Sequence, residues 1–338
     1  MMGSVLRSVL VVHPGGLGDV LLAVPALQAI RSRYPKHELV LLAGTEVGRL
    51  LQACGIIDRI LSIEAGHLAT LFAGPQQFSA QVEELITRCD LAVAWLSDSN
   101  GSLQAALQSR GISRVIVQQP ERGTACHQSD RFLASVQDLP VAHDEGSLRL
   151  NLPEPFCEGG LAELKEAGLE KGAPYVVCHP GSGSPHKCIR PDILVDILTG
   201  CGQRALAPVI TVGPADEHVL QSLEKEGLIG VPVVRPQSLV TLAGLLARAS
   251  AYIGHDSGVT HLAALLGIPT LAMFGPTDPC RWAPRGAHVS VVTGAACSCN
   301  GWDAVRACVD KPCLKIRASK VFLLLDKLLS RYRQVTNS

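Results

Sequence analysis

The chain has 338 residues, of which 47% are hydrophobic and 18% charged, and its 30 basic and 30 acidic residues balance to a formal net charge of zero. At roughly 100–200 residues per domain, this length predicts about two domains. The chain has no basic block that would bind nucleic acid or an anionic membrane surface, and its longest apolar runs are too short to span a bilayer. The composition is typical of a compact α/β protein whose sheets are covered on both faces.

The amino terminus and the cysteines both indicate a cytoplasmic protein. The first residues lead directly into a strand-like run and show no cleavage site, so we expect no signal peptide. The 12 cysteines are scattered through predicted strands and helices. Most of them are expected to be small buried side chains in a reducing compartment rather than a disulfide framework.

Strand-like and helix-like segments alternate along the first third of the chain. Buried strands are predicted at residues 8–12, 38–43, 59–63, 91–95 and 114–118, and amphipathic helices at residues 20–34, 45–54 and 81–89. Strands separated by helices of this length imply right-handed βαβ units and a parallel sheet.

A polar stretch with several prolines and glycines, residues 119–174, interrupts this alternation and predicts a domain boundary. Beyond it the alternation resumes, with strands predicted at residues 175–180, 208–213, 251–256 and 270–275 and helices at residues 190–202, 215–227, 239–250 and 319–331. The sequence therefore predicts two similar doubly wound halves with a ligand cleft between them.

Three loops that follow predicted strands are unusual, and ligands of open α/β sheets bind at such loops. The first reads HPGGLGD, in which Gly15, Gly16 and Gly18 would let the backbone approach a ligand closely. Asp19 then opens a helix, either as its N-cap or as a general base, and the three glycines favour the base. The spacing does not match the dinucleotide fingerprint G-x-G-x-x-G.

The second loop follows the strand at residues 175–180 and reads HPGSGSPHK. Ser182, Gly183 and Ser184 offer hydroxyls and amides, and Lys187 offers a mobile positive charge. This is chemistry that suits a phosphate, although the Walker pattern G-x-x-x-x-G-K-[ST] is absent. The alternative is an ordinary surface turn.

The third loop follows the strand at residues 251–256, which Asp256 ends. The turn is Ser257–Gly258, and Val259 and His261 lie in the first turn of the following helix. The unpaired amides and positive dipole end of such a helix form an anion site, although a histidine there is more often structural. Residues 275–277, at the end of the next strand, are expected on the same rim.

These segments together resemble glycosyltransferase family 9, the heptosyltransferases of lipopolysaccharide core synthesis. The matching stretches occur in the family's order and cover both halves: GGLGDVLLAVPALQAIRSRYP, HPGSGSPHKCIRPDIL, GPADEHVL, GHDSGVTHLAALLGIPTLAMFGPTDP and CSCNGWDAVRACVDKPCLKI. The turn D-[ST]-G-x-x-H-L-A-A followed by F-G-P-T is the most specific part.

The resemblance implies a GT-B fold, in which two Rossmann-like doubly wound domains face each other across a cleft and a C-terminal helix crosses back to the first. Residues 1–160 would form the acceptor-side domain, 161–318 the nucleotide-sugar-binding domain, and 319–338 the C-terminal helix and tail. The implied reaction is an inverting, metal-independent transfer of a sugar, expected to be heptose, from a nucleotide-diphosphate sugar to a lipopolysaccharide-core or related glycan acceptor.

The resemblance also assigns roles to residues. Asp19 falls on the catalytic aspartate, and Lys187 falls on the lysine that contacts the diphosphate. Asp216 or Glu217 falls near the acid that holds the ribose, and the local match does not choose between them. The donor-binding set is Ser182, Gly183, Ser184, Asp216, Glu217, Asp256, Ser257, Gly258, Val259 and His261, and the acceptor-side loop contains His13, Gly15, Gly16 and Gly18.

The match is weaker on the acceptor side. His13 stands where the family often carries a lysine or arginine, and residues 66–81 contain neither. Family members that act on phosphorylated core tend to carry basic residues on acceptor-side loops, whereas the nearby arginines here form no cluster: Arg110, Arg114, Arg122 and Arg131. The sequence therefore indicates the donor better than the acceptor.

The expected partners follow from the same resemblance. The donor substrate is expected to be ADP-heptose, with no cofactor and no metal at the catalytic site, and the acceptor a glycan or lipid-linked molecule. The absence of a D-x-D pair agrees with metal-independent transfer. We expect a monomer that binds no nucleic acid and makes at most peripheral contact with the inner membrane.

Two questions stay open at this point. Cys297, Cys299, Cys308 and Cys313 have ligand-like spacing and would form either a structural zinc site or a packed thiol cluster. The alternative functions are an epimerase of the UDP-GlcNAc type and a non-catalytic sugar-nucleotide-binding module. The order of the loops argues against the epimerase, and the presence of Asp19 argues against the module.

Overall fold

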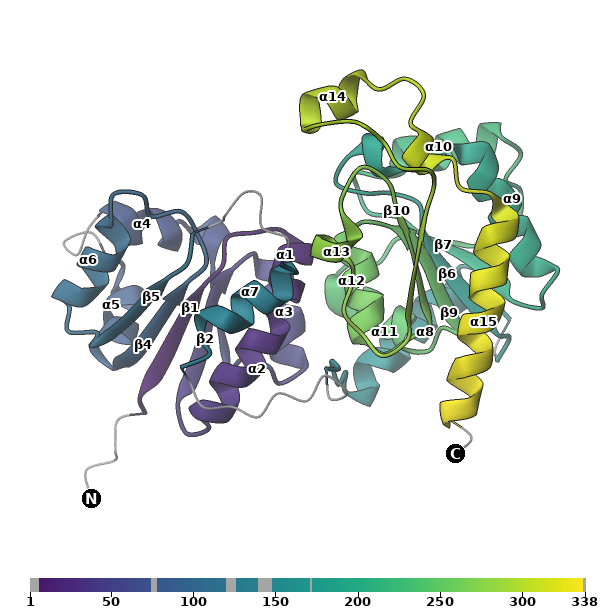
Figure 1. The fold of residues 1–338 in the computed structure, drawn as a ribbon. Helices are drawn as coiled ribbons and strands as arrows, with labels where there is room; N and C mark the ends of the chain where they lie inside the picture. The colour runs from purple at the N-terminus through teal and green to yellow at the C-terminus, as the bar shows by residue number, and fades with distance from the viewer. Residues whose placement is uncertain (1–5, 74–77, 120–125, 139–147, 171, 337–338) are drawn as a thin grey trace. The chain divides into compact units, whose positions relative to one another are not determined.

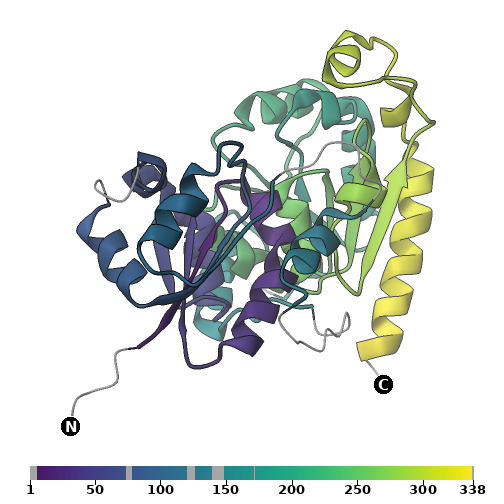
Figure 2. The same ribbon diagram turned by 60° about the vertical axis from the view of Figure 1, so that its left-hand side comes forward.

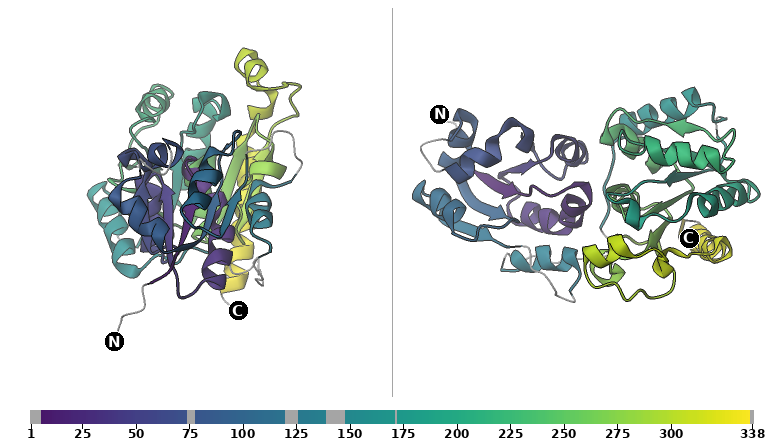
Figure 3. Two further views of the ribbon diagram at one scale, coloured as in Figure 1. Left: turned by 90° about the vertical axis from the view of Figure 1, so that its left-hand side faces the viewer. Right: turned by 90° about the horizontal axis from the view of Figure 1, so that it is seen from above.

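The structure is a computed structural model that describes residues 6–73, 78–119, 126–138, 148–170 and 172–336 (Figure 1). The chain divides into two compact units, Met1–Asp144 and Glu145–Ser338. Each unit contains one parallel sheet with helices on both of its faces (Figure 3). The predicted α/β class with two parallel sheets is therefore confirmed.

The first unit is built on a five-stranded parallel sheet in the order β3-β2-β1-β4-β5. Helices cover both of its faces, which is why β1 is a continuous buried run rather than an alternating one (Figure 2). The strand order reverses between β1 and β4, which is where doubly wound sheets bind ligands. The strands are β1 Ser8–Val12, β2 Glu38–Ala43, β3 Arg59–Ser62, β4 Cys89–Ala94 and β5 Arg114–Val117.

The helices of the first unit differ from the prediction at one point that bears on the candidate site. The single helix expected at residues 20–34 is wrong, because helix formation starts earlier, at Leu17, and is divided at Ala23. Pro25 explains the division, since proline lacks an amide hydrogen and is tolerated only in a helix's first turn. The helices are α1 Leu17–Leu22, α2 Val24–Arg33, α3 Thr45–Ala53, η1 Ile63–Ala65, α4 His67–Ala73, α5 Ala80–Thr87, α6 Ser102–Ser109 and α7 Gln128–Ser135.

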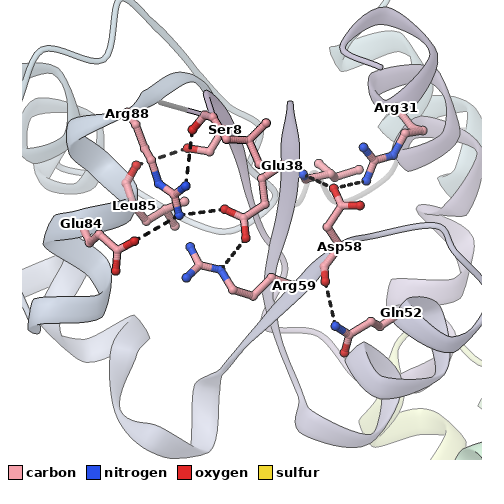
Figure 4. A network of polar contacts seen from close by, with 11 residues as sticks. Ser8, Arg31, Glu38, Gln52, Asp58, Arg59, Glu84, Leu85 and Arg88 are labelled. Atoms are coloured by element: carbon pink, nitrogen blue, oxygen red, sulfur yellow. Dashed lines mark hydrogen bonds and ion pairs between the residues drawn. The ribbon is translucent and has the colours of Figure 1, made fainter. Parts of the chain in front are cut away.

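A network of charged side chains closes the amino end of the first sheet (Figure 4). Glu38, at the start of β2, forms an ion pair with Arg59, whose Nε lies 3.0 Å from the carboxylate, and accepts a hydrogen bond from Arg88 Nη2 at 2.9 Å. Asp58, just before β3, pairs with Arg31. These ion pairs stabilise the amino edge of the sheet. The glycine-rich loop and the other candidate functional loops lie at the opposite, carboxyl edge.

The second unit is built on a six-stranded parallel sheet in the order β11-β10-β9-β6-β7-β8. The order reverses between β6 and β9, which pair in the register Val176↔Ala251 to His179↔Gly254. The loops that follow β6 and β9 are therefore neighbours at the carboxyl edge. The strands are β6 Tyr175–His179, β7 Ala207–Thr211, β8 Val233–Val234, β9 Ala251–His255, β10 Thr270–Phe274 and β11 Val289–Thr293, of which β8 and β11 were not predicted.

The helices of the second unit end with α15, whose apolar stripe of Val321, Leu325 and Leu328 is buried. This stripe packs on α9, β10 and β11 of its own unit. No helix in the described part of the chain is long and apolar enough to cross a membrane. The helices are α8 Glu154–Glu166, η4 Pro185–Lys187, α9 Pro191–Gly202, α10 Glu217–Lys225, α11 Leu239–Ala247, α12 Gly258–Leu265, α13 Pro279–Trp282, α14 Trp302–Ala307, η5 Pro312–Leu314 and α15 Ala318–Thr336.

The division between the units lies earlier than the boundary expected after residue 160, which falls inside α8. α8 buries Cys157 and Leu164 and packs along α11, so it belongs to the second unit. The division itself falls within residues 119–174, the polar stretch in which the sequence predicts a domain boundary.

Candidate functional site

The glycine-rich loop of the first unit connects β1 to α1, and Asp19 lies in the first turn of α1. The N-cap is Gly16 and Asp19 is the third helical residue, so the alternative in which Asp19 is the N-cap is excluded. Its Oδ2 instead accepts a hydrogen bond from the Gly16 amide at 3.2 Å. The carboxylate thus folds back over the loop and satisfies an amide that the helix itself cannot.

His13 fixes the other side of this loop. Its Nδ1 accepts from the Gly15 amide at 3.2 Å, and its ring packs edge-on against Trp95 and Phe132. A Cβ at Gly15 would lie 2.7 Å from His13 Cε1 and 2.8 Å from Asp19 Cβ, so only glycine fits between these two side chains. Burial lowers the pKa of His13 to about 4, so the position often basic in the family is here neutral.

In the second unit, Lys187 and Asp256 form an ion pair at the carboxyl edge of the sheet. Lys187 Nζ, on η4 after β6, lies 2.7 Å from Asp256 Oδ2, after β9, and both side chains are mostly buried. Thr277, after β10, donates to the same carboxylate oxygen at 2.7 Å, and Ser182 donates to the Asp256 carbonyl at 2.6 Å. The loops after β6, β9 and β10 therefore meet at one point, as expected from their places beside the switch point.

The start of α12 supplies amides at this point. Ser257 is the N-cap, and Gly258 and Val259 are the first two helical residues, whose amides precede any intrahelical acceptor. Thr260 holds the turn in place, because its hydroxyl donates to the His255 carbonyl and also bonds Ser257 Oγ at 3.2 Å. The helix dipole and these amides make the turn suitable for an anion.

His261, one turn into α12, is buried. The loop after β6 is partly occupied by its own bonding, since Ser184 Oγ accepts from the His186 amide at 3.3 Å and so caps η4. Gly183 is exposed beside it. Of the hydroxyls expected in donor binding, Ser182 therefore anchors the Asp256 loop and Ser184 caps the turn that carries Lys187.

The two acids that the sequence could not separate have different environments. Asp216 is buried, accepts from the Gly213 amide at 2.8 Å, and lies 3.9 Å from His179 Nε2. Gly181 lies so close to Asp216 that a Cβ at position 181 would overlap the Asp216 carboxylate. Glu217 is the first residue of α10 and is half exposed. It binds Arg235 through two hydrogen bonds, which lower the pKa of Glu217.

Two residues near the ion pair were not predicted. Trp302, on α14, places its ring 5.8 Å from Lys187 Nζ in a cation–π contact. His255 is fully buried, and its Nε2 accepts from the Ile189 amide at 3.1 Å, while burial lowers the pKa of the ring to about 4. The signal for His255 was its place directly before Asp256, whereas no pattern in the sequence points from Trp302 to Lys187.

The arginines near the first unit's loops lie apart from one another, and two of them form ion pairs with different acidic residues. Arg110 pairs with Glu83 at 2.5 Å, and Arg114 lies 3.7 Å from Asp138. Arg131 is buried. Arg122, and residues 74–77 of the stretch that lacks basic side chains, lie outside the described residues.

Two doubly wound parallel units, with candidate ligand-binding loops at the switch point of the second, are consistent with the GT-B architecture of glycosyltransferases. The sequence model of glycosyltransferase family 9 (heptosyltransferase) matches residues 98–308, and the chain belongs to this family. The chain is therefore a glycosyltransferase, which sets aside the epimerase and the non-catalytic module. The matched region includes the donor-type loops and begins after the loop that carries Asp19.

Relatives and a solved structure agree with this assignment. Lipopolysaccharide heptosyltransferase 3 of Escherichia coli K12 is 23% identical over 292 residues, which are 79% of this chain and 82% of that protein. Lipopolysaccharide heptosyltransferase 1 of Pseudomonas aeruginosa is 26% identical over 289 residues, 80% of this chain and 79% of that protein. The structure of E. coli ADP-heptose lipopolysaccharide heptosyltransferase II has a TM-score of 0.73 at 18% identity and covers 97% of this chain and 100% of its own. The expected GT-B fold is thereby confirmed.

Proposed function

We propose that this chain transfers a heptose from ADP-heptose to a lipopolysaccharide-core or related glycan acceptor, with inversion and without a catalytic metal. The observation that carries the proposal is the meeting of Lys187, Asp256 and the start of α12 at the switch point of the second sheet. A lysine and free helix amides are what a diphosphate requires. The family and the names of the relatives support heptose and lipopolysaccharide as the substrate class.

In this proposal the second unit binds the donor. An ammonium has three N–H donors, so Lys187 can contact a phosphate while it still pairs with Asp256. The amides of Gly258 and Val259 would stabilise the negative charge that develops on the departing diphosphate. Because Asp216 is buried and Glu217 is half exposed at the start of α10, we assign Glu217 to the ribose hydroxyls.

Asp19 of the first unit is proposed as the general base. Inversion needs a base that takes the proton from the acceptor hydroxyl as that oxygen attacks the sugar carbon from the face opposite the leaving diphosphate. A carboxylate held over the glycine loop by the Gly16 amide, with Gly15 packed between Asp19 and His13, suits this role. The positive charge that Lys187 and the α12 start supply would take the place of a divalent cation.

The setting of the reaction is also part of the proposal. We propose a monomer in the cytoplasm with at most peripheral contact with the membrane and with a glycan or lipid-linked acceptor. The cysteines of the described residues are free thiols, which suits a reducing compartment. The large exposed hydrophobic side chains lie on separate elements, including Phe72 on α4, Phe156 on α8 and Leu323 on α15.

A panel of nucleotide-diphosphate sugars in a thermal-shift assay, followed by turnover with the best binder, tests this function. A donor at about 100 times its dissociation constant should add roughly 2.7 kcal/mol of stability. The Lys187→Ala variant should lose most of this shift. Transfer should continue in EDTA, and a loss of activity that magnesium or manganese restores would contradict metal independence. If no nucleotide sugar shifts the melting temperature, the donor assignment is wrong.

A further inference from the structure

The tail of the second unit brings together a group of cysteines that the proposed reaction does not use. Cys297, Cys299 and Cys308 place their sulfurs within 4.8 Å of one another. Cys297 Sγ lies 2.9 Å from Cys299 Sγ, and it also interacts with the thiols of Cys308 and Cys313. All four are free thiols, and the first pair is well beyond the disulfide bond length of about 2.05 Å.

Cys297, Cys299 and Cys308 lie on a loop with little hydrophobic burial, whereas Cys313, in η5 at the base of the loop, belongs to the buried core. Gly294 and Ala295 donate backbone hydrogen bonds to the carbonyls of Cys313 and Pro312 at 2.9 and 3.1 Å, which closes the base of the loop. Of residues 296–311, all of which the structure describes, only Val305 is buried. Figure 1 shows this segment, with α14, extending from the rest of the second unit. A projecting loop with one buried side chain needs another source of stability.

We propose that Cys297, Cys299, Cys308 and Cys313 form a four-thiolate site for a zinc ion that holds this loop together. Zn–S bonds of about 2.3 Å in a tetrahedron place the sulfurs about 3.8 Å apart. The sulfurs of Cys297, Cys299 and Cys308, all within 4.8 Å of one another, reach this spacing with small side-chain movements, and Cys313, whose thiol interacts with Cys297, supplies the fourth ligand. Thiolates are soft ligands that select such a cation over magnesium or calcium. Four protein ligands leave no open position, so the site is structural rather than catalytic.

The loop also contributes to the candidate donor site. Trp302 lies between Cys299 and Cys308 in sequence, and its ring contacts the Lys187 ammonium. A metal that fixes the loop would therefore hold Trp302 beside the lysine. This link rests on the proposed function, whereas the metal site itself does not.

Metal analysis of the full-length protein, purified without chelators, tests the site. We expect about one zinc per chain. Replacement by Co²⁺ should give the visible absorption bands and sulfur-to-metal charge transfer of a tetrahedral thiolate site. Cys299→Ser and Cys308→Ser should each lose zinc, whereas Cys126→Ser and Cys280→Ser, which alter exposed thiols elsewhere, should keep it. Where a variant fails to fold, titration of the wild type with a mercurial should release zinc as the thiols react.

Several results would overturn the proposal. A folded wild type without metal, or a Cys297–Cys299 disulfide found by peptide mass, would exclude the site, and iron at the site would exclude zinc. The link to the donor is measured separately by ADP affinity. A folded Cys308→Ser variant without zinc should bind ADP several-fold more weakly, and unchanged affinity would overturn the link alone. A wild type with zinc that binds no ADP would contradict the proposed function and leave the metal site standing.

Discussion

The Asp19→Asn substitution separates the two roles that this residue can have, a structural hydrogen-bond acceptor in the first turn of α1 and a catalytic base. The structure shows that Asp19 Oδ2 accepts from the Gly16 amide at 3.2 Å, and an asparagine carbonyl can accept the same hydrogen bond. What is lost is the negative charge in the first turn of α1, which is worth about 0.3–1 kcal/mol of stability. Loss of a positioned base lowers turnover by about 10²–10⁴-fold, or roughly 2.7–5.4 kcal/mol of barrier.

The assay compares turnover, donor affinity and urea unfolding for the wild type and the variant. We expect nearly unchanged unfolding and donor affinity with greatly reduced transfer. Asp192→Asn is the matched control, because it also removes a first-turn carboxylate, from α9, at a residue without an assigned role in transfer. A folded Asp19→Asn protein that transfers sugar at the wild-type rate would falsify the catalytic assignment.

Two further predictions concern stability. Gly181→Ala should destabilise the protein by about 1–3 kcal/mol, the cost of overpacking, because the new methyl group would overlap the Asp216 carboxylate. The control Gly183→Ala, which has open space around it, should unfold at the wild-type temperature. Equal melting temperatures for the two variants would contradict this geometry. Burial lowers the pKa of His13 and of His255 to about 4, from an unfolded value of about 6.5, so the unfolded chain takes up protons first as the pH falls. The free energy of unfolding should therefore decrease between pH 7 and pH 5, by about 2 kcal/mol for each histidine, and a flat denaturant-unfolding profile over this range would count against it.

Most of the fold could be predicted because its signals are local. The strands β1 and β2 are continuous apolar runs, and the structure gives them the predicted bounds. The strand β11 was missed although its sequence is VSVVT, because only one of its five residues is fully buried and the strand is defined by its pairing with β10, which a local pattern does not contain. The two-residue strand β8 is too short for any period to appear.

The candidate site was predictable at the level of loops and less so at the level of contacts. Parallel strands bring their carboxyl ends to one edge, so the order of the strands along the chain is enough to place the loops after β6 and β9 together. The pairing of Lys187 with Asp256 required the register of β6 and β9, and the separation of Asp216 from Glu217 required their burial. The position of Trp302 beside Lys187 depends on how the cysteine-bearing loop folds.

The charged network at the amino end of the first sheet has a consequence for how such a protein can diverge. Glu38, Arg59 and Arg88 connect β2, β3 and the segment before β4, and none of them belongs to a loop at the carboxyl edge. Insertions and substitutions in the carboxyl-edge loops therefore leave these ion pairs intact. Under the proposed function, acceptor preference can change through those loops while the sheet that supports them keeps its register, so the first unit can acquire new substrates without first losing its ability to fold.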